Sequence, residues 1–226
     1  MKTLEEAVTN YNNNNPYIEI CNDVFCQVSL EIQRNKCNQA GIFDAAKQAE
    51  IIKNLKTRPA LLAYVADYLK DDSNKMENFV EVGTAQGLQS LCFSESFPDA
   101  NVFTCDIVDH RSQRAKDNEK IKFFKSDSLT MCSNLKDDVK FDFCWIDGGH
   151  QSYDVVHDFL SLSRKSHENT VWAFDDFDER FGCYSDILII SRQFEECVVL
   201  DLGLTASGNP NKILLAKRFK LSSHNV

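Results

Sequence analysis

Two short stretches combine acidic residues in a spacing that could do chemistry on a hydroxyl group. The stretches are residues 145–150 and 173–176, and each is an apolar run that ends abruptly in carboxylates. Strands of an open parallel sheet end in this way where ligands bind. Asp147, Asp175 and Asp176 would together form an oxygen-rich site suited to a divalent cation, with magnesium as first choice and manganese or calcium as alternatives.

His150 follows Asp147 by three residues, after a double glycine that allows a sharp exit from the strand. Neutral imidazole is available near pH 7, so this histidine is a candidate proton acceptor beside the cation. A purely structural alternative remains. In that case Asp175 and Asp176 cap the next helix, Asp147 supports the glycine turn, and His150 only packs.

The elements that would position these residues alternate between strand-like and helix-length segments. A helix over residues 151–168 would cross from one acidic strand end to the other. Alternating units of this kind predict a parallel sheet covered on both faces. The strand-like runs are 79–82, 102–105, 121–124, 141–146 and 171–174.

The end of the chain has a different pattern. Residues 195–202 and 212–216 form two more strand-like runs. The segment between them is too short for a crossover helix and contains Gly208-Asn209-Pro210, so an antiparallel hairpin should complete the sheet.

The N-terminal third predicts helices before the main fold. Residues 12–16 are asparagines closed by proline, which separate a short tail from the rest. Residues 45–70 carry apolar side chains at helical spacing, interrupted by Pro59, and predict two helices or one broken helix. We therefore expect a tail and helical cap over 1–76 and a core over 77–226, compact as one domain overall.

Composition excludes several classes of function. The chain has 226 residues, 43% of them hydrophobic, and a formal net charge of −9 without a basic block, so a nucleic-acid partner is not expected. No apolar run approaches the roughly 18 to 20 residues that a bilayer requires. The nine cysteines are odd in number and partly lie in apolar patterns, which favours reduced thiols and a cytoplasmic location.

A glycine-containing turn follows the first predicted strand. Residues 81–87 carry Gly83, which allows a tight turn, and Gly87, which allows close approach of a helix or ligand. A tight turn without a ligand is the alternative. Ala85 occupies the place of a middle glycine, so the three-glycine dinucleotide pattern is missing and NAD is disfavoured.

The next two strands also end in polar residues. Asp106 ends the second strand, where an acid can accept hydrogen bonds from both hydroxyls of a ribose. Ser126, Asp127 and Ser128 end the third strand. A helix cap or a solvated strand end is the alternative role for Asp106, but three successive polar strand ends favour an adenosine-type ligand.

With these features the chain resembles the class I S-adenosylmethionine-dependent methyltransferases over residues 78–219. The resemblance implies a Rossmann-like, doubly wound α/β fold, with a seven-stranded sheet that has one antiparallel strand. It implies that Glu81 and Gly83 lie by the methionine part of the cofactor, Asp106 by the ribose and Asp127 by the adenine amino group. The remaining expected cofactor-binding residues are Thr84, Ala85, Gly87, Ser126 and Ser128.

The pattern Asp147-Gly-Gly-His150 followed by Asp175-Asp176 resembles the metal-dependent sugar O-methyltransferases, including those that act on macrolide deoxysugars. More distantly, it is similar to catechol O-methyltransferases. The resemblance implies three aspartate ligands for the metal, His150 as general base, and a sugar or glycan hydroxyl as acceptor. An aryl or catechol O-methyltransferase and a non-catalytic nucleotide-binding module remain as alternatives.

Overall fold

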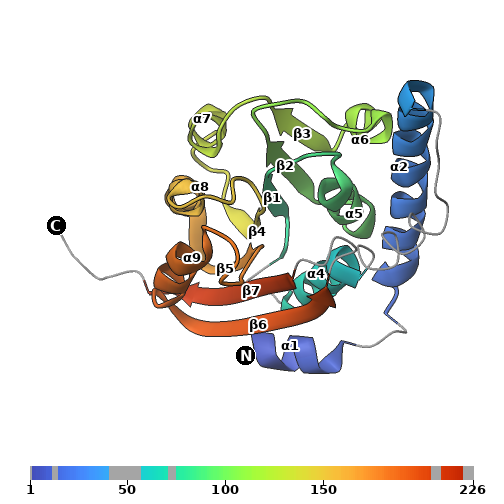
Figure 1. Cartoon of the computed structure of the whole chain (residues 1–226). Coiled ribbons are helices and arrows are strands. Elements are labelled where there is room, and N and C mark those ends of the chain that lie inside the picture. The colour runs from blue at the N-terminus through green and yellow to red at the C-terminus, as the bar shows by residue number, and fades with distance from the viewer. Residues whose placement is uncertain (1, 12–14, 41–56, 71–74, 205–209, 221–226) are drawn as a thin grey trace.

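The structure, a computed structural model, describes residues 2–11, 15–40, 57–70, 75–204 and 210–220. These residues form a seven-stranded sheet in the order β3-β2-β1-β4-β5-β7-β6 (Figure 1). Strand β7 is antiparallel to both of its neighbours, and the pairs among β1 to β5 are parallel. The strands are β1 (Asn78–Val82), β2 (Asn101–Cys105), β3 (Ile121–Phe124), β4 (Phe141–Ile146), β5 (Ser166–Phe174), β6 (Phe194–Leu204) and β7 (Pro210–Phe219). The predicted mixed sheet and its closing hairpin are confirmed.

Helices cover both faces of this sheet (Figure 1). The described helices are α1 (Leu4–Asn10), α2 (Tyr17–Ala40), α4 (Thr57–Leu69), α5 (Leu88–Ser96), α6 (Gln113–Asp117), α7 (Ser128–Asn134), α8 (Asp154–Ser163) and α9 (Tyr184–Ser191). No helix among the described residues is long and apolar enough to span a bilayer. The eight cysteines whose side chains are described are free thiols.

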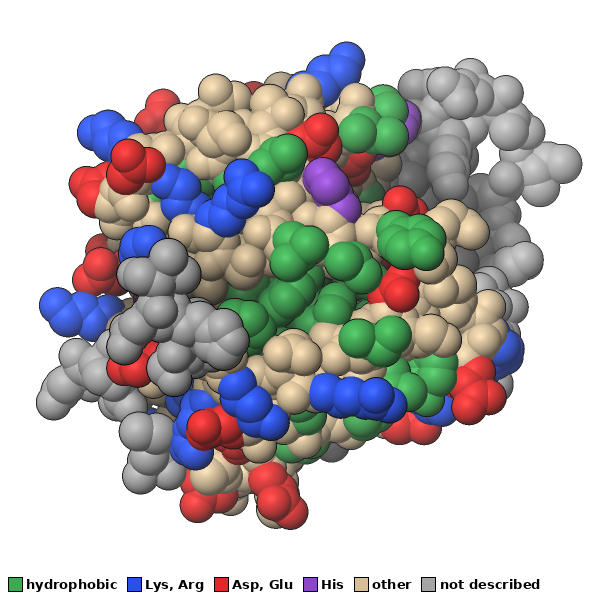
Figure 2. Space-filling model, turned by 90° about the vertical axis from the view of Figure 1, so that its left-hand side faces the viewer, with side chains coloured by type: hydrophobic (Ala, Val, Ile, Leu, Met, Phe, Trp, Pro, Cys, Tyr) green, Lys and Arg blue, Asp and Glu red, His purple; other side chains and the backbone are tan. Residues whose placement is uncertain are grey.

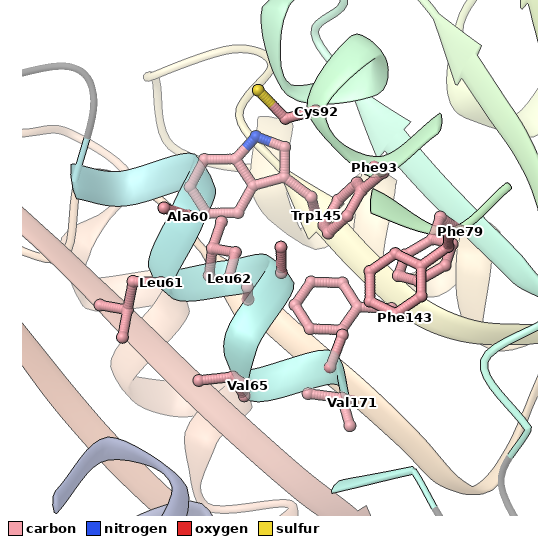
Figure 3. Close-up of a cluster of buried hydrophobic side chains, with 14 of the residues drawn as sticks. Ala60, Leu61, Leu62, Val65, Phe79, Cys92, Phe93, Phe143, Trp145 and Val171 are labelled. Atoms are coloured by element: carbon pink, nitrogen blue, oxygen red, sulfur yellow. The ribbon is translucent and has the colours of Figure 1, made fainter. Parts of the chain in front are cut away.

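Side chains that alternate along the strands divide the core into two clusters. On one face, Phe79, Phe143 and Trp145 pack against α4 and against Phe93 of α5 (Figure 3). On the other face, Trp172 and other buried strand residues pack against α7, α8 and α9. Because both faces are covered, the last four residues of β1, β2, β4 and β5 are buried and, apart from Glu81 and Thr104, apolar.

The N-terminal helices belong to the first of these clusters. Buried residues of α1, α2 and α4 share one hydrophobic core with the sheet. Pro59 does not interrupt a helix here, because it lies in the first turn of α4, where a missing N–H leaves no intrahelical bond unmade. The earlier part of the predicted 45–70 helical region, residues 45–56, lies outside the described residues, as do 12–14.

The crossing helix is shorter than predicted. Helix α8 begins at Asp154, directly after Tyr153 in a left-handed conformation with φ of 72°, and ends at Ser163. Strand β5 already begins at Ser166, which pairs with Phe141 ahead of a β-bulge. Helix α8 lies beside α9. Leu160 of α8 and Ile189 of α9 are exposed. Hydrophobic side chains gather on the face of the molecule that Figure 2 shows.

Candidate active site

The carboxyl ends of β1, β4 and β5 lie side by side, because these strands are neighbours in the sheet. The N–H of Asp147 donates to the Val82 carbonyl at 2.9 Å, and the N–H of Asp175 donates to the Ile146 carbonyl at 3.0 Å. Backbone pairing therefore continues one residue past each strand and fixes both aspartates at the same edge. The strand ends meet where the sequence predicted that a ligand would bind.

The turn after β1 requires glycine at position 83. Gly83 has φ of +90°, and its N–H donates to the Cys105 carbonyl at 3.0 Å. Gly87 also has a positive φ, of +77°, but a β-carbon there would lie 2.7 Å from the β-carbon of Ala115. Gly87 therefore allows the start of α5 to pack against α6, and it does not line either cavity described below.

Asp106, at the end of β2, is held by the turn that it faces. One carboxylate oxygen accepts the N–H of Ala85 at 3.0 Å, and the other accepts the N–H of Val108 at 3.1 Å. The side chain therefore fastens the loop after β2 to the glycine turn. Each carboxylate oxygen retains a second lone pair with which a ligand hydroxyl could be bound.

The polar group after β3 has three different local roles. Asp127 caps α7 by accepting the N–H of Thr130 at 2.7 Å, and this backbone hydrogen bond lowers the pKa of Asp127. The Ser128 hydroxyl donates to buried Asp158 at 2.7 Å, whose pKa is raised by burial. The Ser126 hydroxyl donates to the Asp127 carbonyl. All three residues nevertheless line the larger cavity.

Glu81 and Thr84 point into the protein rather than into the larger cavity. The carboxylate of Glu81 accepts hydrogen bonds from the hydroxyls of Ser90 and Thr104, and burial raises its pKa to about 7. The Thr84 and Thr104 hydroxyls are 2.6 Å apart. Glu81 and Thr84 instead line a second cavity of about 220 Å³, which extends to α2 and α4.

The larger cavity has a volume of about 580 Å³, within the range usual for small-molecule sites. It runs along the carboxyl ends of β1 to β4, so it joins the predicted nucleoside side to the predicted acceptor side. Its lining includes Gly83, Ala85, Asp106, Asp127, Asp147 and His150.

Arg58 of α4 lies between two of the predicted metal ligands. Its Nη1 is 2.5 Å from Oδ2 of Asp175, and its Nη2 is 3.5 Å from Oδ2 of Asp147. The guanidinium carbon lies 5.2 Å from the ring centre of Trp145. Burial opposes the charge of Arg58, but the negative charges of Asp175 and Asp147 outweigh it, so the pKa of Arg58 is raised.

The carboxyl group of Asp147 is strongly affected by its surroundings. Burial and the nearby charge of Asp175 raise its pKa well above the ordinary value, and Arg58 partly offsets them. Carboxyl groups with strongly shifted pKa values occur at ligand sites more often than elsewhere.

Asp176 points to His150 instead of to the other two aspartates. Its Oδ2 is 2.5 Å from Nδ1 of His150, and this hydrogen bond raises the pKa of the imidazole. Asp176 has φ of 55°, a left-handed conformation that aspartate tolerates better than most residues. This backbone turn separates the directions of Asp175 and Asp176, which the sequence alone treated as one pair.

In this arrangement the carboxylates do not fit a metal ion. One oxygen of each predicted ligand already contacts a nitrogen of the protein: Arg58 for Asp147 and Asp175, and His150 for Asp176. Among the described residues, no group of three His, Cys, Asp or Glu side chains is arranged to hold a metal. The expected three-aspartate metal centre is thus not what the structure presents.

Sequence reasoning missed two residues of this region. Arg58 could have been noticed as a cation at the start of a helix whose buried stretch, residues 60–66, is almost wholly apolar. Gln89 lines the second cavity beside Glu81, and both polar atoms of its amide are buried without a hydrogen-bond partner among the described residues. A buried amide of this kind needs a partner, which a ligand could supply.

Residues 80–177 match a family model described as a methyltransferase domain. The match contains all of the site residues that the sequence predicted, from Glu81 to Asp176. This part of the chain is therefore similar to methyltransferase domains, which agrees with the predicted enzyme class. No curated protein matches the chain.

Solved structures share the fold at low sequence identity. A putative O-methyltransferase from Klebsiella pneumoniae is 15% identical, with 83% of this chain and 96% of that chain covered and a TM-score of 0.57. An O-methyltransferase from Bacillus cereus in complex with SAH is 16% identical, covering 84% and 100%, with a TM-score of 0.56. The O-methyltransferase TomG from Streptomyces achromogenes, involved in tomaymycin synthesis and solved with SAM, is 13% identical, covering 84% and 96%, with a TM-score of 0.58. These similarities confirm the Rossmann-like methyltransferase fold.

Proposed function

We propose that this protein transfers the methyl group of S-adenosylmethionine to a hydroxyl group of a small molecule, and that the acceptor is a sugar or glycan. The observation that carries the proposal is the continuous cavity from Asp106 and Asp127 to Asp147 and His150. A nucleoside and a reacting hydroxyl need adjoining sites of this kind, because the methyl donor and the acceptor oxygen must be held close together. The methyltransferase-domain match supports the choice of donor.

The residues present fit S-adenosylmethionine. Asp106 offers two carboxylate oxygens at the ribose position, and Gly83 lines the same cavity. Glu81 and the amide of Gln89, which has no hydrogen-bond partner in the part of the chain that the structure describes, offer polar groups for the methionine end. When bound, the cofactor supplies an electrophilic methyl group on a sulfonium sulfur.

His150 acts as the general base in this proposal. Asp176 holds the Nδ1 side of the ring, so Nδ1 carries a proton and Nε2 carries the lone pair. Nε2 accepts the proton of the acceptor hydroxyl while the oxygen–carbon bond forms and the sulfur–carbon bond breaks. General-base catalysis of this kind typically contributes about 10²- to 10⁴-fold in rate.

The acceptor class rests on the pattern of Asp147-Gly-Gly-His150 and Asp175-Asp176, which resembles sugar O-methyltransferases. An aryl or catechol acceptor is the main rival. That resemblance also predicts magnesium dependence. Because Arg58 lies between two of the carboxylates, the assay below measures methyl transfer with and without magnesium.

Isothermal titration with S-adenosylmethionine, NAD and ATP tests the cofactor first. We expect binding of S-adenosylmethionine only; binding of NAD or ATP instead would support a different nucleotide-binding role. Radiolabelled methyl transfer to panels of glycosides and catechols, each with magnesium or EDTA, then tests the acceptor. Transfer to catechols alone would contradict the sugar assignment.

A matched pair of variants tests the base. His150→Ala should lose about 10²- to 10⁴-fold in rate while its affinity for S-adenosylmethionine stays close to that of the wild type. His167→Gln is the control, because His167 pairs with Asp142 and lines neither cavity. Equal rates for His150→Ala and the wild type would remove His150 from the mechanism.

A further inference from the structure

The acidic strand ends hold a positive charge that belongs to the protein itself. We propose that Arg58 is the resident cation of the acceptor site, in the place where the resemblance implied a divalent metal, and that methyl transfer needs no metal. The guanidinium contacts Asp175 and Asp147 through two different nitrogens. Only the statement about transfer rests on the proposed function; the exclusion of metal by Arg58 can be tested without any turnover.

The position of Arg58 is fixed by the helix that carries it. Ala60, Leu62 and Ala63 follow directly in α4 and are fully buried in the core beneath β4 and β5. The guanidinium also lies over the ring of Trp145, which is itself buried. Arg58 is therefore anchored to the same core as the strand ends, unlike an arginine on a free surface loop.

The contacts of Arg58 explain why the three described aspartates are not arranged to hold a metal ion. Magnesium needs near-octahedral oxygen ligands at about 2.0–2.1 Å that converge on one point. Here the nearest oxygens of Asp147 and Asp175 converge on a guanidinium, while Asp176 is drawn away to His150. A metal bound by these same oxygens would have to break these contacts, which would leave Arg58 partly buried beside a second cation.

Arg58 also has the chemistry to bind an acceptor. A guanidinium carries five N–H donors, and the contacts with Asp147 and Asp175 do not use all of them. Asp147 lines both cavities, and Arg58 lines the second cavity beside it. An acceptor oxygen bound at Asp147 would lie near a fixed positive charge that stabilises negative charge on the oxygen during transfer.

Manganese binding measured by electron paramagnetic resonance tests the exclusion of metal directly. We expect the signal of free Mn²⁺ to be undiminished by the wild-type protein and reduced by Arg58→Ala, because removal of the arginine frees Asp147 and Asp175. The double variant Arg58→Ala/Asp147→Asn should lose that binding again. Arg180→Ala is the matched control, since Arg180 pairs with Asp178, which is not one of the three predicted metal ligands.

The possible results separate clearly. Binding of Mn²⁺ by the wild type that Asp147→Asn abolishes would overturn the proposal. It would also be overturned if neither the wild type nor Arg58→Ala bound Mn²⁺, because Arg58 would then not be what excludes the cation. If Arg58→Ala does not fold, as judged by circular dichroism, Arg58→Met replaces it and keeps the apolar stem.

Activity provides the second readout. The wild type should have the same rate in EDTA and in magnesium, whereas Arg58→Ala should lose about 10²- to 10³-fold, the usual effect of removing a group that stabilises charge on a reacting oxygen. Arg58→Lys should retain more activity than Arg58→Ala because it keeps the charge. A wild-type rate abolished by EDTA would overturn this inference while leaving the methyltransferase proposal intact. Absence of S-adenosylmethionine binding would instead overturn the proposed function, and the manganese titration would still decide the role of Arg58.

Discussion

Gly83 and Asp147 approach so closely that a β-carbon at position 83 would lie 1.9 Å from the Asp147 carbonyl oxygen. The two residues follow β1 and β4, so this contact joins the glycine turn to the first acidic strand end. The cofactor side and the acceptor side of the site therefore form one rigid unit. A change in either turn should affect both.

Gly83→Ala should destabilise the protein strongly. Its positive φ costs about 1–3 kcal/mol for a residue with a β-carbon, and the overlap with Asp147 adds about 1–3 kcal/mol more. Gly203→Ala is the control, because Gly203 has φ of +82° but nothing within 4 Å of an added β-carbon. Urea unfolding measures both. Equal losses of unfolding free energy would show that the contact with Asp147 has no steric effect.

The rate of methyl transfer should depend on the ionisation of His150. Its hydrogen bond to Asp176 raises the pKa of the imidazole, and the base is the neutral form, so kcat should rise with pH through that pKa. Asp176→Asn removes the negative charge and should shift the rising limb to lower pH. A kcat profile that is unchanged in Asp176→Asn would contradict the pairing, and His167→Gln should leave the profile as it is.

Glu81 should make the protein less stable as the pH rises. Burial raises its pKa from 4.5 to about 7, so the folded state binds the proton more tightly than the unfolded state does. The contribution of Glu81 protonation to the free energy of unfolding is fully present below pH 4.5. It is lost as the pH rises to about 7, which lowers the free energy of unfolding by about 3 kcal/mol in total.

Glu81→Gln provides the test, because glutamine has a similar shape and does not ionise. Unfolding free energies measured across this pH range should fall less in the variant than in the wild type. Parallel pH dependence in the two proteins would show that Glu81 does not carry the effect.

Asp106 should contribute to cofactor affinity. Hydrogen bonds to a charged group contribute about 1.5–3 kcal/mol, so Asp106→Asn should weaken S-adenosylmethionine binding by about 10- to 100-fold in isothermal titration. Asp109→Asn is the control, since Asp109 lies in the same loop, pairs with Arg111 and does not line the larger cavity. If both variants bind as tightly as the wild type, Asp106 does not hold the ribose.

The order of the elements and the places where strands end could be predicted from the sequence. Buried parallel strands must be apolar along their length, so the runs before Asp106, Asp147 and Asp175 were visible as strands with polar ends. Neighbouring strands in such a sheet end at one edge, which is why the cavity could be anticipated. The tight turn at Gly83 could also be predicted, because its positive φ is a backbone conformation that favours glycine.

The directions of the side chains at that edge, and the residues that they contact, depend on how the whole chain packs. Asp175 and Asp176 are adjacent in sequence, yet a positive φ at Asp176 directs one to Arg58 and the other to His150. Arg58 itself lies 117 residues before Asp175, and it reaches the site because α4 is packed against the sheet. Periodicity and spacing report local conformation, whereas a contact between distant segments depends on how the whole core packs. For that reason the acids could be predicted from the sequence, and the cation between them could not.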